Sequence, residues 1–123
     1  MAVTSLVWLG IRTPEYAQMV LLYRDVLALE VIHETETATW FRMADGNEVH
    51  VYAQSDADHD FFGSGPVVGF LVDNFDETRS RMIAAGIEFI GEPQREGGSV
   101  WNHYRAPDGN IYGLPQLIEC YHC

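Results

Sequence analysis

The feature that most constrains this sequence is an internal repeat. ALEVIHE at residues 28–34 matches GIEFIGE at 86–92, and FRMADGN at 41–47 matches YRAPDGN at 104–110. The first pair is separated by 58 residues and the second by 63, so five extra residues near 94–98 lengthen a loop of the second copy. Solenoid proteins need about three or more copies of a repeat to be stable. Two copies instead predict two modules related by a pseudo-twofold axis.

The first copy combines a strand, a helix and three further strands. Residues 5–12 alternate between apolar and mixed positions, which predicts a strand with one core face. Thr13-Pro14 has the pattern of an N-cap followed by proline at the first helical position. Apolar residues then recur at helical spacing and form a stripe that extends to Val26 and Leu27. Three strand-like runs follow: LEVIHE, TATWFRM and NEVHVYA.

The second copy repeats this order. VVGFLV predicts a strand, residues 74–85 a helix, and IEFIGE, SVWNHYR and NIYGLP three more strands. Asn74 and Glu77 have the spacing of a capping box, and Gly86 stands where a C-cap glycine belongs. The two copies therefore predict an α+β fold of two curved sheets, each with its helix on the outer face.

A chain of 123 residues is expected to form a single domain. We place a first module at 1–53, an acidic linker at 54–66 and a second module at 67–117. Within the linker, Asp56-x-Asp58-x-Asp60 imitates the start of a calcium-binding loop, but Phe61 replaces the glycine that such a loop requires. We interpret it as a solvated acidic segment.

The charged residues exclude several classes of function. The chain has 7 Lys+Arg against 18 Asp+Glu, a formal charge of -11, and all seven basic residues are arginines. The absence of lysine excludes Schiff-base chemistry and the phosphate-binding lysine of a P-loop. An acidic surface also repels phosphate groups, so neither nucleic acid nor an anionic membrane is an expected partner.

The chain has neither a long apolar run nor the pattern of a signal peptide, so we expect a cytoplasmic protein. Its only cysteines are Cys120 and Cys123, which exclude a disulfide framework. With His122 between them they resemble half of a zinc or redox motif, but no second CxxC accompanies them. We assign the pair no role.

Three motifs carry a resemblance to a known family. They are LYRDVL at 22–27, PVVGFLVD at 66–73 and PDGN at 107–110. With the repeat, they make the chain from about residue 6 to residue 114 resemble the vicinal oxygen chelate superfamily of glyoxalases, bleomycin-resistance proteins and extradiol dioxygenases. The resemblance implies two βαβββ modules whose strands form an open half-barrel cleft. It also implies a homodimer.

In that family the cleft usually holds a divalent metal on four matching strand positions occupied by His, Glu or Gln. The resemblance places these positions on Trp8, His50, Val67 and Gly113. Only His50 has a side chain that binds metals, and such sites need about three or more protein donors. We therefore expect the family's fold without its metal, and no other cofactor.

The turns predict which side chains face the cleft. Ala106-Pro107-Asp108-Gly109 fits a three-residue hairpin loop that places His103 opposite Gly113 and Arg105 opposite Ile111. The same logic in the first copy puts Trp40 and Arg42 on one face, and Phe41 on the face under the helix. The expected ligand-binding residues are Trp8, Arg12, Trp40, Arg42, Glu48, His50, Tyr52, Trp101, His103 and Arg105.

Simpler interpretations remain open for these residues. The tryptophans could fill a closed core, because large aromatic side chains dominate core burial. His50 and His103 could be satisfied polar residues or, with Glu48, an unusual metal set. Arg42 and Glu48 favour a cross-strand ion pair over an acid–base pair.

The function that this sequence favours is binding of a small aromatic or cationic ligand between aromatic side chains, as in bleomycin-resistance proteins. One alternative is a glyoxalase-like lyase or isomerase, or a dioxygenase-type enzyme. It would use His50, with His103 or Glu48, as a base or an unusual metal ligand. A further alternative is a regulatory subunit whose cleft is vestigial.

Overall fold

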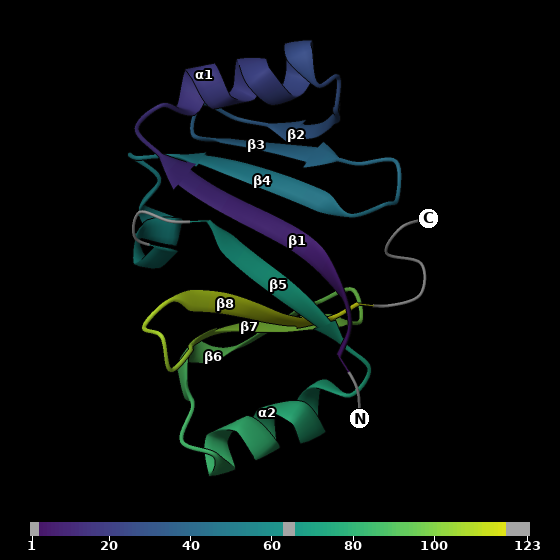
Figure 1. The fold of residues 1–123 in the computed structure, drawn as a ribbon, viewed down its shortest axis with the longest axis vertical. Helices are drawn as coiled ribbons and strands as arrows, with labels where there is room; N and C mark the ends of the chain where they lie inside the picture. The colour runs from purple at the N-terminus through teal and green to yellow at the C-terminus, as the bar shows by residue number, and fades with distance from the viewer. Residues whose placement is uncertain (1–2, 63–65, 118–123) are drawn as a thin grey trace. The chain divides into compact units, whose positions relative to one another are not determined.

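The computed structural model describes residues 3–62 and 66–117 (Figure 1). The chain divides into two compact units. Trp8–Val67 forms the first, and the start of the chain up to Val7 joins the part from Val68 onward in the second. Neighbouring strands follow the order β2-β3-β4-β1 in the first half of the chain and β5-β8-β7-β6 in the second half. Each half has the predicted order of one strand, one helix and three strands, which confirms the α+β class.

The first unit contains four strands and three helical segments. β1 pairs in parallel with β4, and β3 pairs antiparallel with both β2 and β4. The register is the predicted one, with Trp40 opposite His50 and Arg42 opposite Glu48. The elements are β1 (Val3–Thr13), α1 (Tyr16–Leu21), a π-helical turn η1 (Leu22–Val26), β2 (Glu30–Glu34), β3 (Ala38–Arg42), β4 (Glu48–Ala53) and a 3-10 helix η2 (Ala57–Phe62).

Helix α1 covers one face of this sheet (Figure 1). The buried residues beneath it are Val20, Phe41, Val49 and Val51, as the alternation predicts. The predicted apolar stripe is wrong at its end, because Val26 is 72% exposed and Leu27 is 55% exposed. The cause is the π turn, in which the Leu27 N–H donates to the Leu22 carbonyl five residues earlier. The extra residue in this turn moves later side chains off the buried face.

The start of α1 also differs from the prediction. The helix begins at Tyr16, and its N-cap residue is Glu15 rather than Thr13. Parallel pairing with β4 keeps β1 extended as far as Thr13, which lies opposite Ala53. The Thr13 hydroxyl still accepts a hydrogen bond from the Glu15 N–H at 3.0 Å, so it tightens the turn into the helix.

The segment predicted as a solvated acidic linker has a folded part. Ala57–Phe62 forms the 3-10 helix η2, and Phe62 is 5% exposed. Asp58 and Asp60 are exposed, as a solvated segment requires. The aromatic residues beside them pack inward, so this segment belongs to the first unit.

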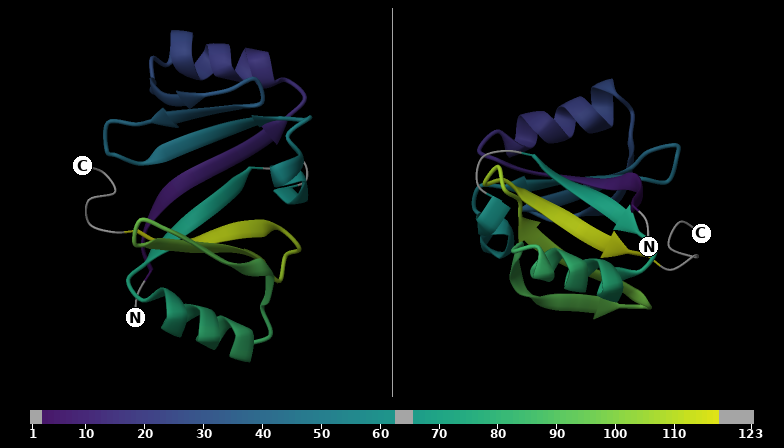
Figure 2. Two further views of the ribbon diagram at one scale, coloured as in Figure 1. Left: turned by 180° about the vertical axis from the view of Figure 1, so that it is seen from behind. Right: turned by 60° about the horizontal axis from the view of Figure 1, so that its bottom comes forward.

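The second unit contains β5 (Val67–Val72), α2 (Phe75–Ala84), β6 (Glu88–Glu96), β7 (Ser99–Arg105) and β8 (Ile111–Gln116). The Asn74 side chain accepts the Glu77 N–H at 3.0 Å, so the predicted helix cap is confirmed. Gly86 has a φ of 91°, as a C-cap glycine requires. Helix α2 lies beside the strands of the second unit (Figure 2). Phe75 and Met82 of α2 pack against a core that includes Val100 and Leu114.

The extra residues of the second copy do not form a longer loop. They lengthen β6, whose pairing with β7 shifts register between Ile90 and Gln94. The chain then turns at Gly97 and Gly98, both with positive φ. The hairpin of β7 and β8 has the predicted register, with His103 opposite Gly113 and Arg105 opposite Ile111.

No helix among the described residues is long and apolar enough to cross a membrane. Cys120, His122 and Cys123 lie outside the described residues.

Candidate functional site

The face of the first sheet opposite α1 carries the candidate site. Trp8 comes from β1, Trp40 from β3, and His50 and Tyr52 from β4, and Phe62 of η2 packs against them. We call these five residues the aromatic face. The same side of the sheet also carries Arg42 and Glu48, as the hairpin register predicts.

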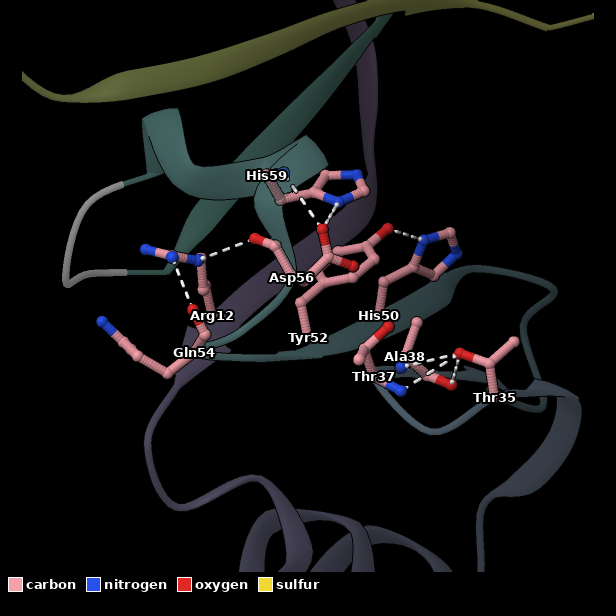
Figure 3. Close-up of polar contacts among 9 residues, drawn as sticks. All are labelled: Arg12, Thr35, Thr37, Ala38, His50, Tyr52, Gln54, Asp56 and His59. Carbon is pink, nitrogen blue, oxygen red and sulfur yellow. Dashed lines mark hydrogen bonds and ion pairs between the residues drawn. The ribbon is translucent and has the colours of Figure 1, made fainter.

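A chain of polar contacts crosses the aromatic face. The Tyr52 hydroxyl lies 3.0 Å from His50 Nδ1, as Figure 3 shows, and His50 Nε2 lies 2.8 Å from Glu48 Oε1. Arg42 Nη2 lies 3.6 Å from Glu48 Oε2. A carboxylate only accepts hydrogen bonds, so His50 carries its proton on Nε2 and Nδ1 accepts from Tyr52. Both ring nitrogens of His50 are therefore engaged within the protein.

Burial sets the protonation state of His50. Glu48 is 4% exposed and His50 is 7% exposed. Burial lowers the pKa of His50, and the hydrogen bond and charge of Glu48 offset part of that effect. The imidazole is consequently neutral at neutral pH, and Arg42 places a positive charge 3.6 Å from the carboxylate of Glu48.

Two tryptophans enclose the His50 ring. Trp40 stacks on it with centroids 4.4 Å apart, and Trp8 meets it edge-on at 5.4 Å. Trp40 also contacts His33 at 4.5 Å, so it lies between its partners on the two neighbouring strands. The indole of Trp8 lies over Gly10, where a Cβ atom would collide with it. Glycine at this position therefore lets Trp8 lie flat along its own strand.

Two donors on β3 lack acceptors. Trp40 Nε1 and Arg42 Nε are buried and have no hydrogen-bond partner in the described part of the chain. A buried donor without an acceptor costs about 1–3 kcal/mol, and native proteins contain few of them. The two residues are separated by one residue on β3 and lie on the same side of the sheet.

The η2 side of the site contains a histidine that the sequence analysis missed. The His59 ring stacks on Tyr52 with centroids 3.7 Å apart and meets Phe62 at 5.2 Å. Its Nδ1 lies 3.0 Å from Asp56 Oδ1 (Figure 3). The signal that could have found it is the Asp56-x-x-His59 spacing, which places both side chains on one turn of a helix.

Other predicted site residues have local partners. Arg12 donates to the carbonyl of Gln54 at 2.6 Å and to that of Asp56 at 3.3 Å, so it anchors the approach to η2 (Figure 3). Trp101, His103 and Arg105 belong to the second unit, where Arg105 donates to the Gly109 carbonyl at 2.9 Å. A ligand-binding role for these residues stays a prediction.

A family model matches residues 5–112. Its description is the Glyoxalase/Bleomycin resistance protein/Dioxygenase superfamily. The chain belongs to this superfamily. The match spans both modules, so the resemblance predicted from the repeat and its motifs is confirmed. No match was found among curated protein sequences.

Solved structures of the superfamily share the fold. A Mn(II)-bound glyoxalase from Novosphingobium aromaticivorans has 22% identity and a TM-score of 0.74, over 93% of this chain and 39% of that chain. A methylmalonyl-CoA epimerase from Mycobacterium tuberculosis has 19% identity and a TM-score of 0.71, over 96% of this chain and 91% of that chain. A superfamily member from Vibrio splendidus 12B01 has 19% identity and a TM-score of 0.68, over 92% of this chain and 100% of that chain.

The residues that the resemblance assigns to the superfamily's metal positions do not by themselves fit a divalent ion. Trp8, Val67 and Gly113 have no metal-binding side chain, and Val67 is buried. His50 has one, but both of its ring nitrogens are hydrogen-bonded to Glu48 and Tyr52. Across residues 3–62 and 66–117, no group of three or more His, Cys, Asp or Glu side chains is arranged to hold a metal ion.

Proposed function

We propose that this protein binds a small, flat aromatic molecule at the aromatic face of its first unit, without the divalent metal of its superfamily. The observation that carries the proposal is the pair of buried donors, Trp40 Nε1 and Arg42 Nε, that have no acceptor among the described residues. Binding sites of small molecules combine aromatic surface with a few directional polar groups. The aromatic face has both.

The unpaired donors favour a ligand that carries an oxygen acceptor, such as a hydroxyl or carbonyl group, on its ring. An aromatic cation without an oxygen atom, such as N-methylquinolinium, offers them no acceptor. The net charge of -11 favours a cation at long range, so it remains the second candidate.

An enzyme that uses His50 as its base has less support. A general base needs a lone pair within reach of the substrate, and Nδ1 of His50 already accepts from Tyr52. A vestigial cleft also has less support, because it would keep the penalty of two unpaired buried donors without any compensating ligand.

Calorimetric titration with two probes tests the proposal. 2-Naphthol offers a flat ring with an oxygen acceptor, and N-methylquinolinium offers a flat cation. We expect 2-naphthol to bind the wild type, and Trp40→Phe to weaken it by roughly threefold to tenfold because the ring stays and one donor is lost. Tyr104→Phe, which removes a hydroxyl on the helix side of the second unit, is the control and should change nothing.

The alternatives predict other outcomes. Binding of N-methylquinolinium alone would support the cationic ligand. The proposal is overturned if neither probe binds.

We further propose that the protein is a cytoplasmic homodimer. Four apolar residues of the α1–η1 region, Leu21, Leu22, Val26 and Leu27, are exposed, and clustered exposed apolar residues are typical of interfaces. The composition, rich in carboxylates and free of lysine, suits a protein that avoids nucleic acid and anionic membranes.

A further inference from the structure

Asp56 and His59 form a carboxylate–histidine pair beside the aromatic face. Asp56 Oδ1 accepts two hydrogen bonds from the same residue, one from the His59 backbone N–H at 3.1 Å and one from Nδ1 at 3.0 Å. The side chain of Asp56 is 10% exposed and that of His59 is 27% exposed. The carboxylate is therefore mostly shielded, while the imidazole keeps an accessible edge.

The partner of Nδ1 determines the tautomer of His59. Because the Asp56 carboxylate accepts but does not donate, the ring proton of neutral His59 is on Nδ1. Nε2 then has a free lone pair, and it makes no hydrogen bond to any described residue. This is the opposite of His50, whose two nitrogens are both engaged.

Packing holds the His59 ring in place. It stacks on Tyr52 with an interplanar angle of 17° and meets Phe62 at 62°. Tyr52 in turn contacts His50, so the His59 ring adjoins the aromatic face. If Asp56 served only as a helix cap, its hydrogen bond to the backbone N–H of residue 59 would be enough, and any side chain could stand at residue 59. The ring contacts add an oriented imidazole whose Nε2 is an acceptor without a partner among the described residues.

We propose that Asp56 and His59 form a dyad whose Nε2 accepts the acidic proton of a bound aromatic ligand, which assigns the site to phenols or related weakly acidic hydroxyl compounds. This inference rests on the proposed function. The proton moves from the ligand oxygen to Nε2, the O–H electron pair stays on the oxygen, and the resulting imidazolium is stabilised by the Asp56 carboxylate.

Acylation of histidines by diethyl pyrocarbonate tests the dyad without any ligand. The reagent is attacked by a neutral imidazole nitrogen that has a free lone pair, and mass spectrometry of peptides gives a rate for each histidine. We expect His59 to react and His50 to be protected. Asp56→Asn keeps a good helix cap but removes the charge, and should slow His59 by roughly tenfold. Asp58→Asn, on the exposed side of η2, should leave the rate unchanged.

His33 is the internal control, because it lies on β2, away from Asp56, and should react equally in all three proteins. The dyad is overturned if Asp56→Asn leaves the His59 rate equal to that of the wild type. An equal loss in Asp58→Asn would also overturn it, because the effect would then be one of general charge.

A comparison of 2-naphthol with 2-methoxynaphthalene tests the ligand class. Both have the ring and the oxygen, but only the first has an O–H to donate. We expect the wild type to prefer 2-naphthol by roughly threefold to tenfold and His59→Phe, which keeps an aromatic ring, to lose the preference. Equal binding of both probes overturns this inference and leaves the proposed function standing. Absence of binding by both overturns the proposed function and the ligand class, and the acylation rates then decide on the dyad alone.

Discussion

At the scale of single residues, the buried polar chain through Glu48, His50 and Tyr52 determines the chemistry of the site. A carboxylate that is 4% exposed is stable only with charged or hydrogen-bonding partners, and Arg42 and His50 supply them. The same contacts occupy both ring nitrogens of His50.

The lowered pKa of His50 predicts how stability depends on pH. As the pH falls through about 6.5, the unfolded chain takes up a proton at residue 50 before the folded protein does. The free energy of unfolding should therefore fall on acidification, by at most about 1.4 kcal/mol per pH unit from this group. Urea unfolding at about pH 7 and about pH 5.5 measures it.

His50→Gln should lose less stability than the wild type between these pH values, whereas His33→Gln, at an exposed position, should match the wild type. Equal losses in all three proteins would contradict the assignment.

Gly10 predicts a second effect at this scale. A methyl group at residue 10 would collide with the Trp8 indole, whereas at Gly113 its nearest neighbour lies at an ordinary 3.5 Å. Gly10→Ala should displace Trp8, destabilise the protein by about 1–3 kcal/mol and weaken 2-naphthol binding. Gly113→Ala is the control, with a smaller loss of stability in the same denaturant titration. A harmless Gly10→Ala would show that Trp8 does not occupy this position.

At the scale of elements, the turns were predictable because their chemistry is local. Glycines after Asp45 and Asp108 define the two hairpins, and a hairpin loop determines its register, so the partners of Trp40 and His103 followed from sequence. The π turn at η1 was not predictable, because the apolar positions of the predicted stripe fit an ordinary helix equally well. The packing of η2 was also missed, because the alternating acidic residues before Phe61 and Phe62 indicate a solvent-exposed segment.

The anchoring of η2 can be tested with that pair. Phe62 is 5% exposed and contacts Trp8, Tyr52 and His59, whereas Phe61 is partly exposed. Phe62→Ala should reduce the free energy of unfolding by about 3–5 kcal/mol, and Phe61→Ala by clearly less. If neither variant loses stability, the segment is a solvated linker as the composition suggested.

At the scale of the whole molecule, the proposed dimer is open to a direct test. Light scattering at micromolar concentration should give twice the chain mass of 13.9 kDa. Val26→Glu places a charge among the exposed apolar residues of the α1–η1 region and should give the monomer mass. Ile83→Glu, at an exposed position on α2 of the second unit, should leave the dimer intact. A monomeric wild type would contradict the proposal.

The superfamily fold is kept in this protein, and the proposed function requires no metal. The most direct test of the account is the affinity of the wild type for 2-naphthol before and after treatment with an excess of chelator. We predict the same dissociation constant in both samples. Binding that disappears with the chelator and returns with Mn²⁺, Ni²⁺ or Zn²⁺ would contradict the account, and so would the absence of binding in both samples.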